Sequence, residues 1–352
     1  MIEKESVIAL SKILNVSQDR FAPFTTKMKD ALSSYIESEN GSIFMFQDII
    51  THEKYVIKVK SKEYYTEFEK KLNLENDEYF KQQFYKGYAI FLIKFAHIRE
   101  ITIYSNNDTL LQTHIPLYLG NRIVGNSTYI VMKYIDFFPE LPLLDKTEIA
   151  ICFLARLHSR FFKQYKKLDS MQLNILSPQL FSENKYLLKS VFKTAIEQSE
   201  LPQQLTKEIS NYIDRLECEF ADMQNNGLTL CHCDFAFRNI TFDSGKPIII
   251  DWELATALEP HFDLVEFLVD YPMKLNAHII DYIIDKYISH IDFLIDSADK
   301  SVNFYISMQR NLYHYFVVRQ AFLLVINKII PMHWTNDSIR NYITLWEHIV
   351  KR

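Results

Sequence analysis

Glycine is scarce in this chain, with only six among 352 residues. The sequence contains neither G-x-G-x-x-G nor G-x-x-x-x-G-K-[ST], which argues against Rossmann and P-loop nucleotide sites. An excess of basic residues is also lacking, because the net charge is −5 at pH 7. We therefore expect no nucleic-acid partner.

Signals for export and for membrane insertion are missing as well. The N-terminus MIEKESVIAL does not follow a signal-peptide pattern, and the four cysteines lack the spacing of a secreted disulfide framework. Polar residues interrupt the most apolar late stretch, 316–331, which makes it too polar to span a bilayer. These absences predict a cytoplasmic protein without a membrane partner, and they leave its oligomeric state open.

The stretch 228–254, LTLCHCDFAFRNITFDSGKPIIIDWEL, carries the densest group of chemically useful side chains. An apolar strand leads into a loop with Asp234 and Asn239, and after a turn at 243–245 a second apolar strand, 247–250, ends on Asp251. Phosphoryl transfer from a nucleotide needs one Asp to orient and deprotonate a hydroxyl, and an Asn and a second Asp to hold magnesium. The spacing assigns Asp234 to catalysis and Asn239 and Asp251 to the metal.

Simpler explanations exist for parts of this stretch. Asp and Asn are ordinary turn residues, and an Asp after an apolar strand often only caps a loop. The ordered set from His232 to Glu253 favours the catalytic interpretation over these local ones. Cys231 and Cys233 flank His232, but three adjacent residues cannot wrap one tetrahedral zinc, and we interpret both cysteines as small strand residues.

The combination of HCDFAFRN with IIIDWE resembles the aminoglycoside phosphotransferase and choline kinase family, whose members are small-molecule kinases with a protein-kinase-like fold. LARLHSRFF (154–162) and EPHFDLVEFL (259–268) resemble further segments of that family. The resemblance implies that Asp263 anchors the loop after Asp251 and that His158 is a core histidine. The sequence departs from the family where Cys233 replaces the usual Gly and where Ala236 stands in place of a polar residue.

The resemblance implies an α+β fold with two lobes. Residues 1–135 would form the N-lobe, with an antiparallel sheet, one long helix (84–104) and an N-terminal helical extension. Residues 136–352 would form a mainly helical C-lobe with the catalytic loop and the acceptor site. Strand patterns agree with this division, because outside 228–251 they are confined to the first 135 residues, at 43–50, 55–59, 114–120 and 127–136.

The same resemblance assigns the nucleotide contacts. Gly41 and Ser42 would cover the nucleotide, and Lys58 would neutralise its α- and β-phosphates. Lys54 and Lys60 are alternatives to Lys58, which is favoured because apolar residues surround it in YVIKV.

Glu100, in the HIREITIY segment, is expected to hold Lys58, with Glu69 and Glu78 as alternatives. Met132 and Tyr134 fall in the expected hinge, 132–135, whose backbone groups would bind adenine.

The predicted function is magnesium-dependent transfer of the γ-phosphate of ATP or GTP to a hydroxyl of a small acceptor. A protein kinase is disfavoured because no A-P-E segment follows IDWE. A non-catalytic nucleotide-binding scaffold is the other alternative. Residues 259–300 contain nine acids against three Lys or Arg, which would suit a cationic acceptor such as an aminoglycoside-like or amino-alcohol compound. Helix surfaces can also be acidic for solubility alone.

Overall fold

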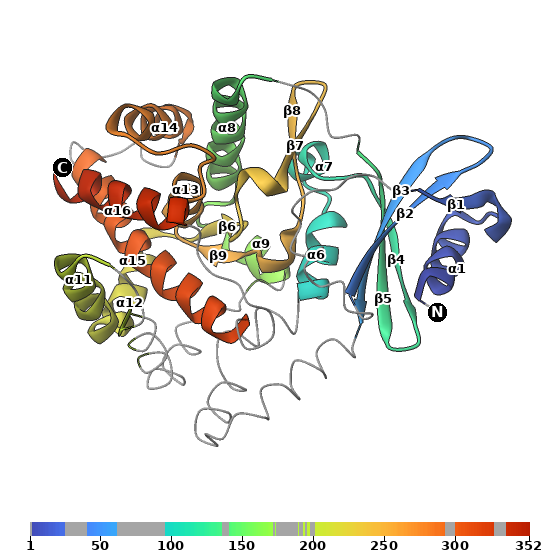
Figure 1. Cartoon of the computed structure of the whole chain (residues 1–352), viewed down its shortest axis with the longest axis horizontal. Helices are drawn as coiled ribbons and strands as arrows, with labels where there is room; N and C mark the ends of the chain where they lie inside the picture. The colour runs from blue at the N-terminus through green and yellow to red at the C-terminus, as the bar shows by residue number, and fades with distance from the viewer. Residues whose placement is uncertain are drawn as a thin grey trace, which may run out of the picture.

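The computed structural model describes residues 2–24, 41–61, 96–135, 141–171, 201–292, 300–326 and 336–352, together with positions 173, 189, 193, 196 and 197. A sheet-bearing N-lobe lies on the right of Figure 1 and a helical C-lobe on the left. Glu69 and Glu78, the alternatives to Glu100, and the first half of the expected helix 84–104 lie outside these residues. The expected lobe boundary at 135 adjoins the gap at 136–140 and stays a prediction.

The N-lobe is built on a five-stranded antiparallel sheet with the strand order β1-β2-β3-β5-β4. Strands β2 and β3 form the hairpin predicted at 43–59, although β2 begins and ends two residues earlier than predicted and β3 is longer than predicted. The bounds are β1 Phe21–Pro23, β2 Gly41–Asp48, β3 Lys54–Ser61, β4 Tyr118–Val124 and β5 Ser127–Lys133.

Alternation along β3 gives this sheet two different faces. Ile57 and Val59 are buried in an apolar cluster with Leu10 of helix α1 (Ile2–Leu14). Lys58 and Lys60 point to the opposite face, because successive side chains of a strand alternate. Figure 1 shows α1 on the outer side of the sheet, so the two lysines face the C-lobe.

Helices α6 (Ala96–Tyr104) and α7 (Thr109–His114) connect β3 to β4. The sequence analysis was wrong to expect a loop over 105–113 and a strand beginning at His114. Asp108 accepts a hydrogen bond from Leu110 N at 3.0 Å and caps α7, which the sequence analysis overlooked. The following turn is at Gly125 and Asn126, and Gly120 lies within β4 at a bulge.

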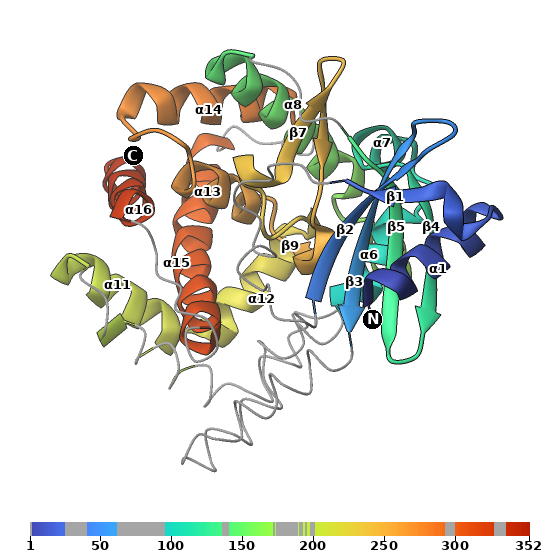
Figure 2. The same ribbon diagram turned by 45° about the vertical axis from the view of Figure 1, so that its right-hand side comes forward.

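The C-lobe is organised around helix α13 (His261–Val269), all of whose residues are buried. Helices α15 and α16 pack against α13, as the view in Figure 2 shows. The bounds of the other helices described in the C-lobe are α8 Leu143–Phe161, α9 Tyr165–Ser170, α11 Gln203–Asp214, α12 Leu216–Asn226, α14 Ala277–His290, α15 Lys300–Ile326 and α16 Asn336–Val350.

Helix α12 ends at Asn226 and is capped by Gly227, whose φ of 118° is readily adopted only by glycine. A Cβ at this position would lie 2.5 Å from Lys163 Cε, so a larger residue would also clash. The chain therefore turns sharply from α12 into the strand that precedes the catalytic loop.

Two short antiparallel strand pairs lie in the motif region. β6 (Thr229–Cys231) pairs with β9 (Thr256–Leu258), and β7 (Ile240–Asp243) pairs with β8 (Lys246–Ile249). The sequence analysis placed the approach strand and the strand before Asp251 but missed β7 and β9, which are short. The α+β class with an antiparallel N-lobe sheet and a mainly helical C-lobe is confirmed. Among the described helices, none is both long and apolar enough to cross a membrane.

Candidate active site

Two buried carboxylates of α13 hold the loop that follows β6. Asp263 accepts hydrogen bonds from the backbone N–H groups of His232 at 2.7 Å and Cys233 at 2.9 Å. Glu266 accepts one from Phe235 N at 2.8 Å. Asp263 thus lies against the catalytic loop, and its contacts suit the anchoring role predicted for it.

Cys233 adopts a left-handed backbone conformation with φ 59°. This conformation costs a residue with a Cβ roughly 1–2 kcal/mol, whereas glycine adopts it freely. The geometry explains why glycine would suit this position. Burial raises the pKa of the Cys233 thiol well above its usual range, and the carboxylates of Asp263 and Glu266 add to the effect. The thiol is therefore neutral and not a nucleophile.

His232 ties the loop to the end of β8. Its Nδ1 accepts a hydrogen bond from Asp234 N at 3.2 Å, so its Nε2 carries the proton and donates to Ile250 O at 2.9 Å. The ring lies 4.6 Å from that of Trp252, centroid to centroid. His232 therefore orients the residues on both sides of it and has no spare ring nitrogen for proton transfer.

Asp234 and Asn239 are in direct contact at the two ends of this loop. Asn239, at the end of the short 3₁₀ helix η3 (Phe237–Asn239), donates from Nδ2 to Asp234 Oδ2 at 2.7 Å and to Asp234 O at 2.8 Å. The amide oxygen Oδ1 of Asn239 therefore points away from Asp234. The side chain of Asp234 is 16% exposed, so an acceptor can reach it from solvent.

Asp251 follows β8 and is placed beside Asn239 by the backbone. Ile250 N donates to Asn239 O at 3.0 Å, and Asp251 N donates to the Tyr104 hydroxyl at 3.2 Å. Asp251 has φ 68° and ψ 53°, a left-handed conformation that is uncommon for residues other than glycine. Asp251 and the amide oxygen of Asn239 are hard oxygen donors of the kind that a magnesium ion binds.

Lys58, Glu100 and Asp251 form one buried ionic group between the lobes. Lys58 Nζ donates to Glu100 Oε1 at 2.6 Å and to Asp251 Oδ1 at 2.8 Å. Burial alone would raise the pKa of Asp251, but the ammonium groups of Lys58 and Lys60 outweigh it and hold that pKa below its usual range. Asp251 is therefore ionised, as a metal ligand must be.

A second ion pair lies next to the first and was missed in the sequence analysis. Lys60 Nζ binds Glu253 Oε2 and lies 4.0 Å from Glu100 Oε2. Lys60 had been considered only as a substitute for Lys58. The signal that could have revealed it is the spacing of two, which puts both lysines on the same face of β3.

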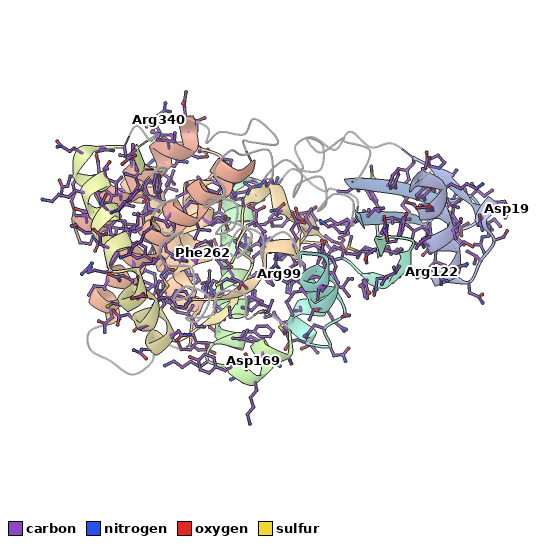
Figure 3. All side chains as sticks on the ribbon, turned by 90° about the horizontal axis from the view of Figure 1, so that it is seen from below. Asp19, Arg99, Arg122, Asp169, Phe262 and Arg340 are labelled. Atoms are coloured by element: carbon purple, nitrogen blue, oxygen red, sulfur yellow. The ribbon has the colours of Figure 1, made fainter. Side chains whose placement is uncertain are left out.

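Arg99 adds a third cation from the N-lobe. Its Nε donates to Glu253 O at 2.7 Å, and Figure 3 shows Arg99 where the two lobes meet. Tyr104 was also missed. Its hydroxyl donates to Glu100 Oε1 at 3.1 Å, and the spacing of four that separates the two residues on α6 was visible in the sequence.

The remaining predicted nucleotide residues lie on the sheet. Gly41 and Ser42 open β2 and pair with Lys60 and Val59 of β3. Met132 is buried on β5, and Tyr134 N donates to Lys54 O at 2.9 Å just beyond that strand. Their contacts with a nucleotide stay predictions, as do the roles of the other site residues.

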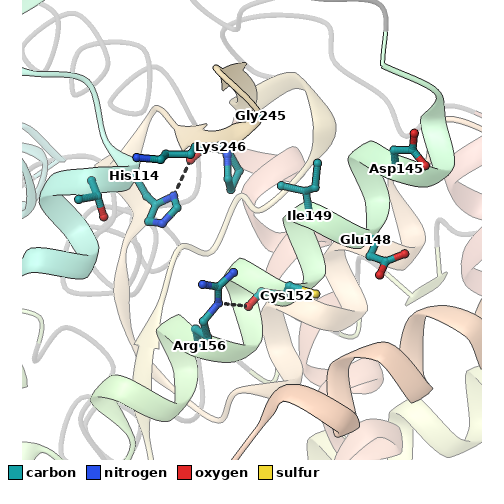
Figure 4. A pocket seen from close by; sticks show the side chains of 10 residues that line it. His114, Asp145, Glu148, Ile149, Cys152, Arg156, Gly245 and Lys246 are labelled. Atoms are coloured by element: carbon teal, nitrogen blue, oxygen red, sulfur yellow. Dashed lines mark hydrogen bonds between the residues drawn. The ribbon is translucent and has the colours of Figure 1, made fainter.

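A cavity of about 530 Å³ lies elsewhere, between α7, α8 and the β7–β8 turn (Figure 4). Its lining includes His114, Glu148, Arg156 and Lys246 but none of the predicted site residues. His114 is bonded to Pro247 O at 2.8 Å, and Arg156 to Cys152 O at 3.1 Å. The cavity lies at the β7–β8 turn, at the far end of this hairpin from Asn239 and Asp251.

Comparisons with known proteins agree with the predicted resemblance. Residues 147–298 match the model of the phosphotransferase enzyme family. A search of curated proteins finds no match.

Among solved structures, this chain is similar to choline kinase LicA from Streptococcus pneumoniae, with 14% sequence identity and a TM-score of 0.49. The alignment covers 100% of this chain and 98% of LicA. Choline kinase from Cryptosporidium parvum Iowa II matches at 14% identity and 0.47, covering 96% and 90%. The gentamicin complex of APH(2")-IIa matches at 14% and 0.43, covering 96% of each chain.

The family match spans Asp234, Asn239 and Asp251 but not Lys58 or Glu100, whose contacts with each other and with Asp251 come from the structure. The resemblance predicted from HCDFAFRN and IIIDWE is confirmed, and residues 147–298 of this chain carry the sequence pattern of the phosphotransferase enzyme family.

Proposed function

We propose that this protein transfers the γ-phosphoryl group of a nucleoside triphosphate, ATP or GTP, to a hydroxyl group of a small-molecule acceptor. The observation that carries the proposal is the pairing of two half-sites. One is the loop on which Asp234 and Asn239 touch, and the other is the Lys58–Glu100–Asp251 group. The first provides a base and the second a cation beside an ionised carboxylate, the parts that phosphoryl transfer requires.

Asp234 acts on the acceptor in this proposal. An acceptor hydroxyl would donate to the Asp234 carboxylate, which orients it towards the phosphorus atom and takes its proton as the new bond forms. Asn239 keeps this carboxylate in place through the hydrogen bond to Oδ2. A contribution of about 10²–10⁴ in rate is expected of such a base.

Lys58 neutralises the phosphate oxygens of the donor, and Glu100 fixes its direction. The Lys58 ammonium is charged, because Asp251 and Glu100 raise its pKa well above the usual range, although burial alone would lower it. Asp251 and Asn239 would hold a magnesium ion, which when bound neutralises charge on the phosphates. In that state Lys58 is free to exchange Asp251 Oδ1 for a phosphate oxygen while keeping its bond to Glu100.

A cationic acceptor stays a prediction, and the acidic stretch 259–300 supports it less than the sequence suggested. The acids nearest the site within 259–300 have partners in the protein: Asp263 and Glu266 bind loop N–H groups, and Asp270 binds Arg238. Glu259 is paired with Arg310 at 3.1 Å. A cationic acceptor would therefore have to be recognised by charges other than these four.

The test is turnover of the purified protein with magnesium and ATP or GTP across amines, amino alcohols, neutral sugars and macrolides, measured as coupled nucleotide hydrolysis. Asp234→Asn should lower kcat about 10²–10⁴-fold on whichever acceptor is used. Asp243→Asn is the matched control, because Asp243 is exposed at the tip of the neighbouring hairpin. Equal rates for wild type and Asp234→Asn would refute the proposal, as would nucleotide binding without turnover of any acceptor.

A further inference from the structure

Arg238 touches the proposed base and has no role in the function described so far. It lies on η3, directly before Asn239 and four residues after Asp234. Its Nη2 binds Asp234 Oδ1, and its Nη1 donates to Asp270 Oδ2 at 2.9 Å. Because Asn239 occupies Oδ2, both oxygens of the Asp234 carboxylate have a fixed donor.

Asp270 braces Arg238 against the helical lobe. It is the C-terminal cap of α13, where its N–H donates to Glu266 O at 2.9 Å. Its second carboxylate oxygen accepts from Ser338 Oγ of α16 at 3.2 Å. The side chain of Asp270 is 12% exposed, so this brace is largely shielded from water. A continuous chain of contacts therefore runs from α16 and α13 through Arg238 to Asp234.

Other charged groups surround this chain, and they balance it. Arg319 Nη1 of α15 lies 3.9 Å from Asp234 Oδ1. Burial raises the pKa of Glu266 well above its usual range, and the carboxylate of Asp234 adds to the effect. Two arginines, Arg238 and Arg319, lie next to Asp234, and Asp270 binds Arg238 from the other side. This pairing of opposite charges argues for a holding role and against a general attraction for anionic ligands.

Arg215 forms an exposed surface ion pair with which Arg238 can be compared. Arg215 binds Glu219 at 2.9 Å, also across a spacing of four, but its side chain is 68% exposed. Pairs of that kind contribute about 0–1 kcal/mol to stability. Arg238 is 33% exposed and has a second carboxylate partner, so its guanidinium is held in one orientation.

We propose that Arg238, braced by Asp270, is a positioning residue that fixes the Asp234 carboxylate for the acceptor hydroxyl. The inference rests on the proposed function. Each carboxylate oxygen can accept two hydrogen bonds, so Oδ1 can bind Arg238 and still receive the hydroxyl. A displacement of about 1 Å in such a group lowers rates about 10²-fold, which is why its orientation matters.

The experiment measures kcat, acceptor KM and nucleotide-analogue Kd for Arg238→Ala, Arg238→Lys and the control Arg215→Ala. Arg238→Ala should lower kcat about 10²-fold and leave KM and Kd within about threefold. About 20 mM guanidinium chloride, far below unfolding concentrations, should restore part of kcat in Arg238→Ala only. Arg238→Lys should lie between, because lysine restores the charge but not the fork that reaches two carboxylates.

Several results would overturn the inference: kcat of Arg238→Ala within about threefold of wild type, a loss confined to KM, no rescue by guanidinium, or an equal loss in Arg215→Ala. Where Arg238→Ala does not fold, Asp270→Asn takes its place, with an expected kcat loss of about tenfold at unchanged KM. An unchanged kcat in Asp270→Asn overturns the inference. Absence of turnover by wild type refutes the proposed function and this inference with it, whereas turnover that is indifferent to Arg238 refutes this inference alone.

Discussion

His261, the first residue of α13, should make the protein sensitive to acid. The side chain is buried beside Phe304, with ring centroids 4.8 Å apart, and among the described residues neither ring nitrogen has a hydrogen-bond partner. Burial, with a smaller contribution from His158 and Arg310, lowers the pKa of His261 from 6.5 to about 3. The folded protein therefore keeps this imidazole neutral at pH values where the unfolded chain protonates it.

The sign of the effect follows from proton uptake. Between pH 6.5 and 3 the unfolded state binds a proton at this position that the folded state does not, so stability decreases as the pH falls through this window. Each pH unit is equivalent to about 1.4 kcal/mol, so at pH 4.5 the loss from His261 is about 2.7 kcal/mol. Domains are stable by about 5–15 kcal/mol, and such a loss is readily measured.

The assay is urea unfolding at pH 7.0, 5.5 and 4.5 for wild type and His261→Phe. Phenylalanine keeps an aromatic ring beside Phe304 and removes the titrating nitrogens. The variant should lose about 2–3 kcal/mol less than wild type between pH 7.0 and 4.5. His278→Phe, at an exposed position of α14, is the control and should lose as much as wild type. If His261→Phe loses as much as wild type to within about 1 kcal/mol, the assigned burial of a neutral imidazole is wrong.

Three further predictions concern the site. Asp251→Ala should lower turnover by much more than tenfold, and a loss within about tenfold, or 1.4 kcal/mol of barrier, would contradict its assignment to the metal. The effects of Lys60→Met and Glu253→Gln on the free energy of unfolding should be non-additive in the double variant, with a coupling of about 1–2 kcal/mol, because both side chains are only 22% exposed. Additive losses would show that the ion pair contributes nothing to stability. Raising the salt concentration from about 50 to 300 mM should increase KM for a cationic acceptor and leave KM for a neutral one unchanged.

The sequence was sufficient to place Asp234 and Asn239 together because their contact is local. Asp234 and Asn239 are five residues apart, and a single loop with a short helical turn brings them together. The motif spacing contains this information directly. Lys58 and Glu100 are 42 residues apart, and only the resemblance to a family joined them in advance.

Short elements and long-range partners could not be predicted from the sequence. Strand β9 has three residues and pairs with β6 across the motif, so no alternation pattern of useful length marks it. Helix α7 has six residues, too few for a recognisable apolar stripe, and only the Asp108 cap announces it. Arg238 stood in the printed motif, but its partner Asp270 lies 32 residues later on another element.

The acidic stretch 259–300 shows why counting charges is a poor guide to binding. Its net charge in the sequence suggested an attraction for cations. In the structure, Glu259 is buried against Arg310, and Asp263 and Glu266 bind backbone N–H groups of the loop. A carboxylate whose charge is used inside the protein attracts little from outside it. Asp263 and Glu266 therefore contribute first to the shape of the loop that carries Asp234.

The position of the two lobes depends on the same short segment that would hold the metal. Lys58 contacts Asp251, and both Lys60 and Arg99 contact Glu253. Three cations of the N-lobe therefore bind the three-residue segment 251–253. A ligand that recruits Lys58 away from Asp251 leaves the Lys60 and Arg99 contacts intact. The lobes can then remain together while the charge at Asp251 becomes available to a cation. On the proposed function the two neighbouring lysines would have different tasks, because Lys58 would exchange partners during binding and Lys60 would keep the N-lobe attached to the loop.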